Sequence, residues 1–265
     1  MNIKVIKKKA KSIFVKTKLP GCDWVINQYV GCQHACKYCY AKFMCKWKGY
    51  GKWGSWVEVK VNAPELVRDR YVKGCVYMSS ISDPYQPLEA ELKLTRSILK
   101  NTDKRISLSI QTKSKLVLRD VDLFKQFKDV EVGLTINGFE GKLKHEIEPF
   151  SSTHSKRIDA LKELRENSIR NYAFISPVIP GLVDVKTLID ETKSFVDFYW
   201  IEILNVRGAG KEFIAWLKNN FIDSYEKLVV FEKRKEFIKD ILKVVKKERV
   251  RVRGVVVHPG FAMLK

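Results

Sequence analysis

The stretch that decides the fold of this chain is Gly31-Cys32-Gln33-His34-Ala35-Cys36-Lys37-Tyr38-Cys39-Tyr40. Its cysteines have the spacing C-x3-C-x2-C, so one short loop offers three thiolates. A [4Fe–4S] cluster takes thiolate ligands, and three of them leave the fourth iron without a protein ligand. Such an iron is useful only when another molecule binds it. The loop therefore predicts a cluster with one open iron, held by Cys32, Cys36 and Cys39.

A structural zinc site is the alternative interpretation of this loop. Zinc in a closed site takes four ligands, commonly from two C-x2-C pairs, and the sequence has no second pair. The fourth ligand would have to come from Cys22, Cys45 or His34. A disulfide framework fits less well, because six cysteines in 265 residues is a low density and we find no secretory signal.

The composition favours a polyanionic partner. Lys and Arg number 50 against 30 Asp and Glu, which gives a net charge of +20 and is typical of proteins that bind nucleic acid. Lys-rich composition across a whole proteome would give the same balance. Residues 47–56 interleave Trp and Tyr with Lys and Gly, a pattern that suits stacking on unpaired bases. The same aromatics would also serve as a lid that shields the cluster from water.

No apolar run approaches the length of a membrane span, so we expect a soluble, cytoplasmic protein without membrane contact. The length suits one domain of barrel size. We expect a basic N-terminal extension at 1–28, a barrel core at 29–205, and C-terminal helices with one strand at 206–265. Two short strands at 3–5 and 12–15 are expected to pair as a hairpin.

Strands alternate with helices along the rest of the chain. Such alternation predicts a parallel sheet with right-handed crossovers, so we expect an α/β fold, a partial (β/α)6 TIM-like barrel with a long C-terminal helix. The expected strands are 75–79, 106–111, 130–136, 172–175, 198–204 and 250–257. The expected helices are 62–72, 88–99, 121–127, 152–167, 185–195, 211–219 and 224–247.

Polar residues collect just after these strands. They are Ser82-Asp83, Thr112-Lys113, Asn137 and Asn205. The carboxyl ends of parallel barrel strands meet on one rim, and barrels of this kind place their chemistry there. We therefore expect these side chains to surround the active site, together with the cysteine loop.

Several segments together resemble the radical S-adenosylmethionine (SAM) superfamily, and within it the branch similar to spore photoproduct lyase, often labelled DNA repair photolyase. They run from about residue 29 to 183 in the order found in that branch. The segments are Tyr29 to Ala41, Ser82 to Glu89, Leu94-Thr95-Arg96, Gln111 to Ser114, Leu118-Arg119-Asp120, Glu148-Pro149, Arg157 and Pro180-Gly181.

This resemblance implies two cofactors, a [4Fe–4S] cluster and SAM, and assigns residues to them. Cys32, Cys36 and Cys39 would ligate the cluster. Ser82 and Asp83 would meet the SAM amino group, and Lys113 its carboxylate or ribose. Thr135 and Asn137 would make further SAM contacts. Tyr38 and Tyr40 match two tyrosines that the lyase uses to return a hydrogen atom to SAM.

The resemblance also implies a reaction, in which SAM is cleaved to a 5′-deoxyadenosyl radical that abstracts hydrogen from a nucleic-acid substrate. An external electron donor such as ferredoxin or flavodoxin would be needed. The lyase quenches its product radical with a cysteine, but this chain has Ser80 there. The alternatives are a radical SAM enzyme for a small metabolite or peptide, and a non-catalytic nucleic-acid-binding protein with an iron–sulfur or zinc site.

Overall fold

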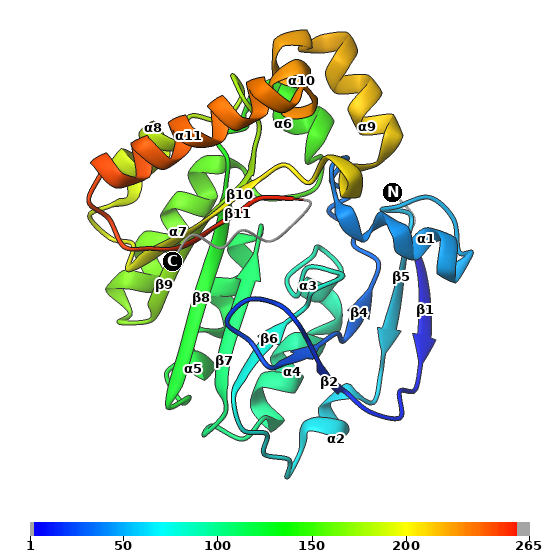
Figure 1. Ribbon diagram of the computed structural model, residues 1–265. Coiled ribbons are helices and arrows are strands. Elements are labelled where there is room, and N and C mark those ends of the chain that lie inside the picture. Colours follow the sequence, from blue (N-terminus) through cyan, green and yellow to red (C-terminus); the bar gives the residue numbers. More distant parts are fainter. Residues whose placement is uncertain (1–2, 259–265) are drawn as a thin grey trace.

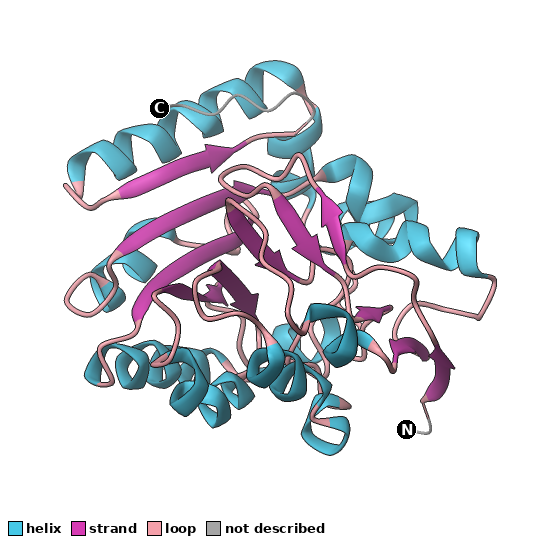
Figure 2. Ribbon diagram, turned by 90° about the horizontal axis from the view of Figure 1, so that it is seen from below, coloured by secondary structure: helices cyan, strands magenta, loops and turns pink. Residues whose placement is uncertain are grey.

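A curved sheet with helices along its outer side forms the body of the molecule (Figures 1 and 2). The computed structural model describes residues 3–258, and all structural statements below concern that range. The sheet order is β2-β3-β6-β7-β8-β9-β10-β11. The strands are β2 (Phe14–Lys16), β3 (Trp24–Ile26), β6 (Cys75–Met78), β7 (Ser107–Thr112), β8 (Asp129–Ile136), β9 (Arg170–Val178), β10 (Phe198–Ile203) and β11 (Val252–Val256).

The pairing confirms the predicted partial TIM-like barrel. Every neighbouring pair from β3 to β11 is parallel, and β2 adds an antiparallel edge. The described edge strands β2 and β11 do not pair with each other, so the barrel stays open. Because β3 belongs to this sheet, the sheet begins inside the segment 1–28 that the sequence assigned to an extension.

Side chains of the strands alternate between the helices and the inside of the curved sheet. On β8, Val132, Leu134 and Ile136 are fully buried in the apolar core, and Glu131 and Thr135 line an internal cavity. The outer layer packs on these strands, with α7 against β8 and β9 and α8 against β9. Its members are α2 (Ala63–Val67), α3 (Glu89–Leu92), α4 (Leu94–Asn101), η2 (Lys115–Asp120), α5 (Val121–Phe124), α7 (His154–Glu166) and α8 (Val185–Thr192).

A second, three-stranded sheet carries the start of the cysteine loop. Its order is β1 (Lys4–Lys8), β5 (Trp56–Lys60) and β4 (Tyr29–Val30). The expected hairpin between the first two strands is therefore wrong. β1 pairs in parallel with β5, and β2 pairs with β3, because the buried strands β3 and β5, which periodicity did not reveal, offer longer-range partners.

Three helices near the C-terminus follow β10, and α9 (Val206–Asn220), the first of them, lies beside the cysteine loop (Figure 1). The other two are α10 (Ile222–Val229) and α11 (Phe231–Lys247), and α9 packs on the short helix η1 (Tyr40–Lys42). The single helix expected at 224–247 is wrong, since Val230 is extended with ψ of 121°. The break lets α10 pack on α9 and α11 on α8, and the β-branched pair Val229-Val230 favours it.

Two other helix predictions also need correction. The helix expected at 88–99 is divided by Lys93, whose φ of 49° is left-handed, into α3 and α4. The helix expected at 62–72 ends at Val67, because Arg68 has extended backbone. An unpredicted helix, α6 (Gly141–Ile147), precedes Glu148. Among residues 3–258, no helix combines the length and the apolar character that crossing a membrane requires.

One glycine of the central strand has a structural task. Gly133 on β8 lies opposite Tyr172 on β9, and a Cβ at Gly133 would come within 2.2 Å of the tyrosine ring. The Tyr172 hydroxyl reaches past β8 and donates a hydrogen bond of 3.3 Å to the Ile110 carbonyl on β7. The ring therefore lies flat over β8 and forms part of the cavity floor.

We expect Gly133→Ala to destabilise the protein by roughly 1–3 kcal/mol, because the new methyl group overpacks the space that the Tyr172 ring fills. Chemical denaturation would measure the change in unfolding free energy. The same substitution in a Tyr172→Leu background should cost clearly less, since the shorter side chain leaves room. Equal costs in both backgrounds would contradict this explanation.

Candidate active site

The cysteine loop lies over the carboxyl ends of the barrel strands. It connects β4 to η1, and Cys32 and Cys36 are buried while Cys39 is half-buried. All three cysteines line one cavity of about 490 Å³, which they share with Ser82, Asp83, Lys113 and Thr135. The structure therefore brings the predicted cluster ligands to the same cavity as four of the predicted SAM contacts.

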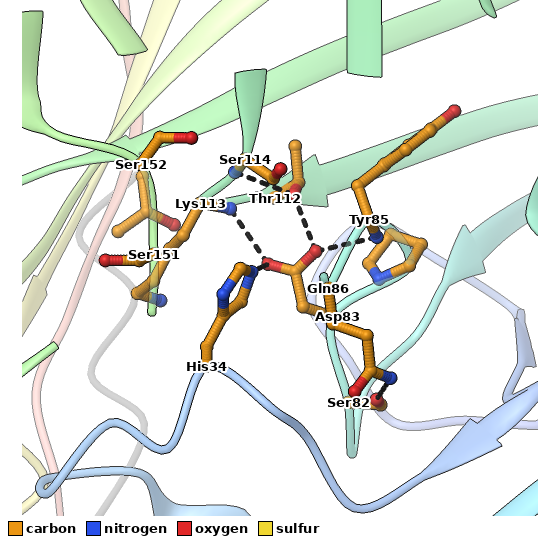
Figure 3. Close-up of polar contacts among 12 residues, drawn as sticks. His34, Ser82, Asp83, Tyr85, Gln86, Thr112, Lys113, Ser114, Ser151 and Ser152 are labelled. Atoms are coloured by element: carbon orange, nitrogen blue, oxygen red, sulfur yellow. Dashed lines mark hydrogen bonds and ion pairs between the residues drawn. The ribbon is translucent and has the colours of Figure 1, made fainter. Parts of the chain in front are cut away.

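Asp83 holds the cysteine loop to the strand ends (Figure 3). One carboxylate oxygen accepts hydrogen bonds from the Thr112 hydroxyl at 2.6 Å and the Tyr85 amide at 2.8 Å. The other oxygen accepts from the Lys113 amide at 2.8 Å and lies 3.3 Å from His34 Nε2. His34 belongs to the cysteine loop, and its Nδ1–H donates to the Phe150 carbonyl at 3.0 Å.

These contacts keep Asp83 ionised although it is buried. Burial by itself raises the pKa of a carboxyl group. Here the adjacent His34 and the hydrogen bonds from Thr112 and Lys113 outweigh burial and lower the pKa of Asp83 to about 2. The carboxylate is thus a fixed negative charge that anchors the cysteine loop and the end of β7.

Ser82 makes a second connection to the loop. Its hydroxyl donates to the Gly31 carbonyl at 2.6 Å and accepts from the Gln86 side-chain amide at 2.9 Å. The Gln86 side-chain carbonyl in turn accepts from the Gln33 backbone amide at 2.8 Å. The segment that follows β6 therefore positions the backbone on the N-terminal side of the cysteines.

A buried ion pair supports the loop on the opposite side. Glu148 and Arg157 are both essentially inaccessible to solvent and form an ion pair. Glu148 also accepts hydrogen bonds from the Tyr38 hydroxyl and from the Asn137 amide, the latter at 2.8 Å. Arg157 donates at 3.0 Å to the Thr135 carbonyl. The pair thus joins Tyr38, between two of the cysteines, to the ends of β8 and the helix α7.

The charges of this pair also determine the ionisation of Glu148. Burial raises the pKa of Glu148, but Arg157, Lys113 and the hydrogen bond from Tyr38 outweigh it and lower that pKa to about 2. Removing the counter-charge from a fully buried ion leaves it uncompensated, which is far more costly than losing a surface pair. The position of Tyr38 therefore depends on the Glu148–Arg157 ion pair, whose loss would strongly destabilise the protein.

Lys113 has a different environment from the other site residues. Its ammonium group makes no hydrogen bond and no ion pair within residues 3–258, and its side chain lines the cavity. Burial lowers the pKa of Lys113, but Cys36 and Glu148 raise it more, so the group stays cationic. The ammonium lies 5.8 Å from the centre of the Tyr38 ring. A cation that is held in a cavity without an ion-pair partner can bind an anionic group of a ligand.

The remaining predicted residues fall into two groups. Tyr40 and Thr135 line the cavity, and the Tyr40 hydroxyl donates to the Ser80 carbonyl. Asn137 instead lies in the buried network, where its amide group donates to Glu148 and to the Ser176 carbonyl at 3.3 Å. Tyr38 lines the cavity, but its hydroxyl is directed to Glu148.

The chemistry of the three cysteines suits an iron–sulfur cluster. Burial raises the pKa of all three thiols, and Lys113 acts in the opposite direction on Cys36 and Cys39. In the part of the chain that the structure describes, no three His, Cys, Asp or Glu side chains are arranged to hold a single metal ion. A [4Fe–4S] cluster binds each thiolate at a different iron, so its ligands do not meet at one point.

The inner part of the cavity is aromatic with paired polar groups. Tyr77, Tyr172, Phe174 and Trp200 line it. Trp200 lies over Gly254 of β11, where an added Cβ would come within 2.4 Å of the indole ring. The cavity also contains the ion pair of Arg253 with Glu131 at 2.8 Å and the pair of His258 with Glu202 at 2.9 Å.

The aromatic residues of the segment 47–56 differ in position, and some suit base stacking while others suit a lid over the cavity. Trp47 is 76% exposed, whereas Trp56, the first residue of β5, is fully buried in a cluster with Val30 and Met44. Trp53 lines the cavity, and its indole N–H is buried without a hydrogen-bond partner. Trp47 is therefore accessible for stacking, while Trp53 covers the cavity beside the cysteine loop.

Sequence reasoning missed the residues that position the loop. It considered His34 as a candidate zinc ligand, or as a turn or supporting residue of the loop, without identifying its partners. In the structure its side chain joins the loop to Asp83 and to Phe150. It gave no role to Glu148 and Arg157, which form the buried pair. A polar side chain inside a cysteine motif was the available signal for His34. No local pattern identifies Tyr38, Asn137 and Arg157 as partners of Glu148, since they come from three separate segments.

The sequence matches a family model and individual proteins. Residues 26–190 match the family model of the Radical SAM superfamily. An uncharacterized protein of Methanocaldococcus jannaschii is 57% identical over 256 residues, covering 97% of this chain and 98% of that protein. A radical SAM Nα-GlyT isomerase of Pseudomonas phage M6 is 27% identical over 164 residues, 57% of this chain and 32% of that protein.

Solved structures extend the likeness in fold. A variant of spore photoproduct lyase with bound SAM and dinucleoside spore photoproduct superposes with a TM-score of 0.64. The match covers 94% of this chain and 81% of that one at 14% sequence identity. At this identity the match concerns the fold, and it extends over nearly the whole chain.

We expect Glu148→Gln to destabilise the protein by about 3–5 kcal/mol, because it leaves the Arg157 charge buried without a counter-ion. Thermal or chemical denaturation measures the loss. The matched control is Glu146→Gln, two residues away, which removes a partly exposed ion pair with Lys37 but keeps an oxygen that can accept the hydrogen bond of the Trp216 indole. It should cost about 1 kcal/mol or less. Similar losses for both variants would contradict the role assigned to the buried pair.

Proposed function

The chain belongs to the radical SAM superfamily of enzymes, and from this we propose that it uses its cysteine loop and cavity to perform SAM-dependent radical chemistry on a nucleic-acid substrate. The observation that carries the proposal is the shared cavity. This cavity is lined by three cysteines of one loop, by a lysine without an ion pair and by several aromatic side chains. Members of this superfamily use a [4Fe–4S] cluster together with SAM.

The residues present fit the cluster. Cys32, Cys36 and Cys39 would be its three ligands, and the fourth iron would be free to bind SAM. The loop that carries them is held on both sides, by Asp83 through His34 and by Glu148 through Tyr38. These contacts fix the positions of the cysteines at the cavity, where they would hold the cluster and limit access of water to it.

The rim of the cavity fits SAM. The Lys113 ammonium has no ion-pair partner among residues 3–258 and would bind the SAM carboxylate. Ser82, Asp83 and Thr135 line the same cavity and would supply hydrogen-bonding groups around it. Asn137 lies in the buried network, so we assign it to support of this rim. With both cofactors bound and an electron supplied by an external donor, the site would provide a 5′-deoxyadenosyl radical for removal of a hydrogen atom from the substrate. The protein contributes binding, orientation and exclusion of water.

Tyr40 is the better placed of the two tyrosines for a role in hydrogen transfer. Its side chain lines the cavity, and its hydroxyl donates to the backbone carbonyl of Ser80. The Tyr38 hydroxyl donates to Glu148 within the buried network. We therefore propose that Tyr40 contacts the bound reactants, and that Tyr38 positions the loop.

A nucleic-acid substrate is supported by charge and by the inner cavity. The net charge of +20 suits a polyanion, and flat aromatic walls with paired charged groups suit a planar base with polar edges. The spore photoproduct lyase structure of similar fold contains a dinucleoside. A small metabolite or a peptide is the second candidate, because the same cavity would accept other flat, polar ligands. A ferredoxin or flavodoxin would supply the electron.

The cluster assignment predicts the outcome of single cysteine substitutions. Cys36→Ala should lower the iron and sulfide content after anaerobic reconstitution and abolish 5′-deoxyadenosine formation, since a ligand is lost. Cys45→Ala is the matched control, because Cys45 lies on α1 and is assigned no ligand role. Absorbance, iron analysis and chromatography measure these quantities. Full cleavage of SAM by Cys36→Ala would exclude the assignment.

The substrate assignment predicts how nucleic acid affects SAM cleavage. The reconstituted wild-type protein, reduced with dithionite, should form 5′-deoxyadenosine, and thymine-dimer-containing or undamaged oligonucleotides should stimulate it. Stimulation by one of them would indicate the substrate class. Formation of 5′-deoxyadenosine that no oligonucleotide changes would favour the small-molecule or peptide candidate. An iron-loaded protein that forms none would refute the radical SAM function itself.

A further inference from the structure

A row of accessible aromatic side chains begins at the mouth of the cavity. Tyr40, Phe43 and Trp47 are 43%, 44% and 76% exposed and occupy successive turns of η1 and α1 (Phe43–Lys48). Residues three and four apart share one face of a helix. Phe43 and Trp47 contact each other with ring centroids 5.4 Å apart. Tyr40 lines the cavity, so the row connects the cavity with the protein surface.

The surroundings of this row are basic. No acidic residue occurs between Asp23 and Glu58, and Glu58 itself forms an ion pair with Lys48 at 2.9 Å. Lys46 is exposed on α1. On the neighbouring strand β1, the Lys4 and Lys8 ammonium groups lie 5.7 and 5.8 Å from the ring of Tyr50, just after α1. Positive charge therefore accompanies the aromatic row.

We propose that Tyr40, Phe43 and Trp47 form a stacking surface for the bases of a single-stranded nucleic acid, next to the base that enters the cavity, while Lys46, Lys4 and Lys8 contact its phosphates. The inference rests on the proposed function and adds the form of the substrate. Single-strand binders combine aromatic platforms with a basic track in this way. Because the row leads into the cavity, it suits the substrate rather than an electron donor.

The matching control lies elsewhere on the molecule. Phe231, at the start of α11, is 73% exposed, about as much as Trp47. It is separated from the cysteine loop in sequence and lies outside the cavity lining. Substituting it removes a comparable exposed aromatic side chain without touching the proposed row.

The test is fluorescence anisotropy with a labelled single-stranded oligothymidylate at fixed salt. Trp47→Ala should weaken binding roughly tenfold, as loss of one stacked base does, Phe43→Ala less, and Phe231→Ala not at all. Circular dichroism verifies that each variant is folded. An oligonucleotide of the same length with abasic sites keeps the phosphates but loses the bases. On this ligand Trp47→Ala should match the wild type.

Three results would overturn the inference. In the first, Trp47→Ala and Phe231→Ala bind the oligothymidylate with equal affinity. In the second, Trp47→Ala weakens binding of the abasic oligonucleotide as much as binding of the oligothymidylate. In the third, Trp47→Ala binds the oligonucleotide as the wild type does but needs more flavodoxin for SAM cleavage. The last would assign the surface to the electron donor. Dithionite-driven formation of 5′-deoxyadenosine by the wild-type protein, without oligonucleotide, tests the radical SAM function separately. Failure of the stacking surface is thus distinguishable from failure of the proposed chemistry.

Discussion

The buried ion pair of Glu148 and Arg157 is the interaction on which the site depends. It lies where solvent cannot replace a lost partner, and it connects α7, the end of β8 and the cysteine loop through Tyr38. Asp83 gives the loop a second fixed charge through His34. The cysteines sit between these two anchors, and a loop without regular hydrogen bonding thereby obtains a defined position.

The open barrel provides room for two ligands. Its strands direct apolar side chains to the helices and polar or aromatic ones inward, so the concave side is a chamber rather than a packed core. Gly133 and Gly254 let the rings of Tyr172 and Trp200 lie flat against the sheet, which keeps the chamber wide. SAM at the rim would leave this inner aromatic space for a substrate base.

The charged residues of the site are of two kinds, those with charged partners in the protein and one that is available to a ligand. Asp83, Glu148 and Arg157 each have charged or hydrogen-bonding partners within the protein, and these contacts position the site. Lys113 is the opposite case, because its ammonium lies over the Tyr38 ring but has no ion pair or hydrogen bond among residues 3–258. Beyond the cavity, the exposed row of Tyr40, Phe43 and Trp47 adds a surface that could bind neighbouring bases.

The sequence by itself determined the barrel class, most of its strands and the residues of the cysteine loop. Alternating strands and helices have local periodicity, and the cysteine spacing is contained in ten residues, so both can be recognised without a structure. Only the tertiary structure decided which elements meet. The pairing of β1 with β5, the break at Val230 and the partners of Glu148 and His34 depend on contacts between distant segments. Such contacts follow from packing and buried charge, and they leave no periodic signal in the chain.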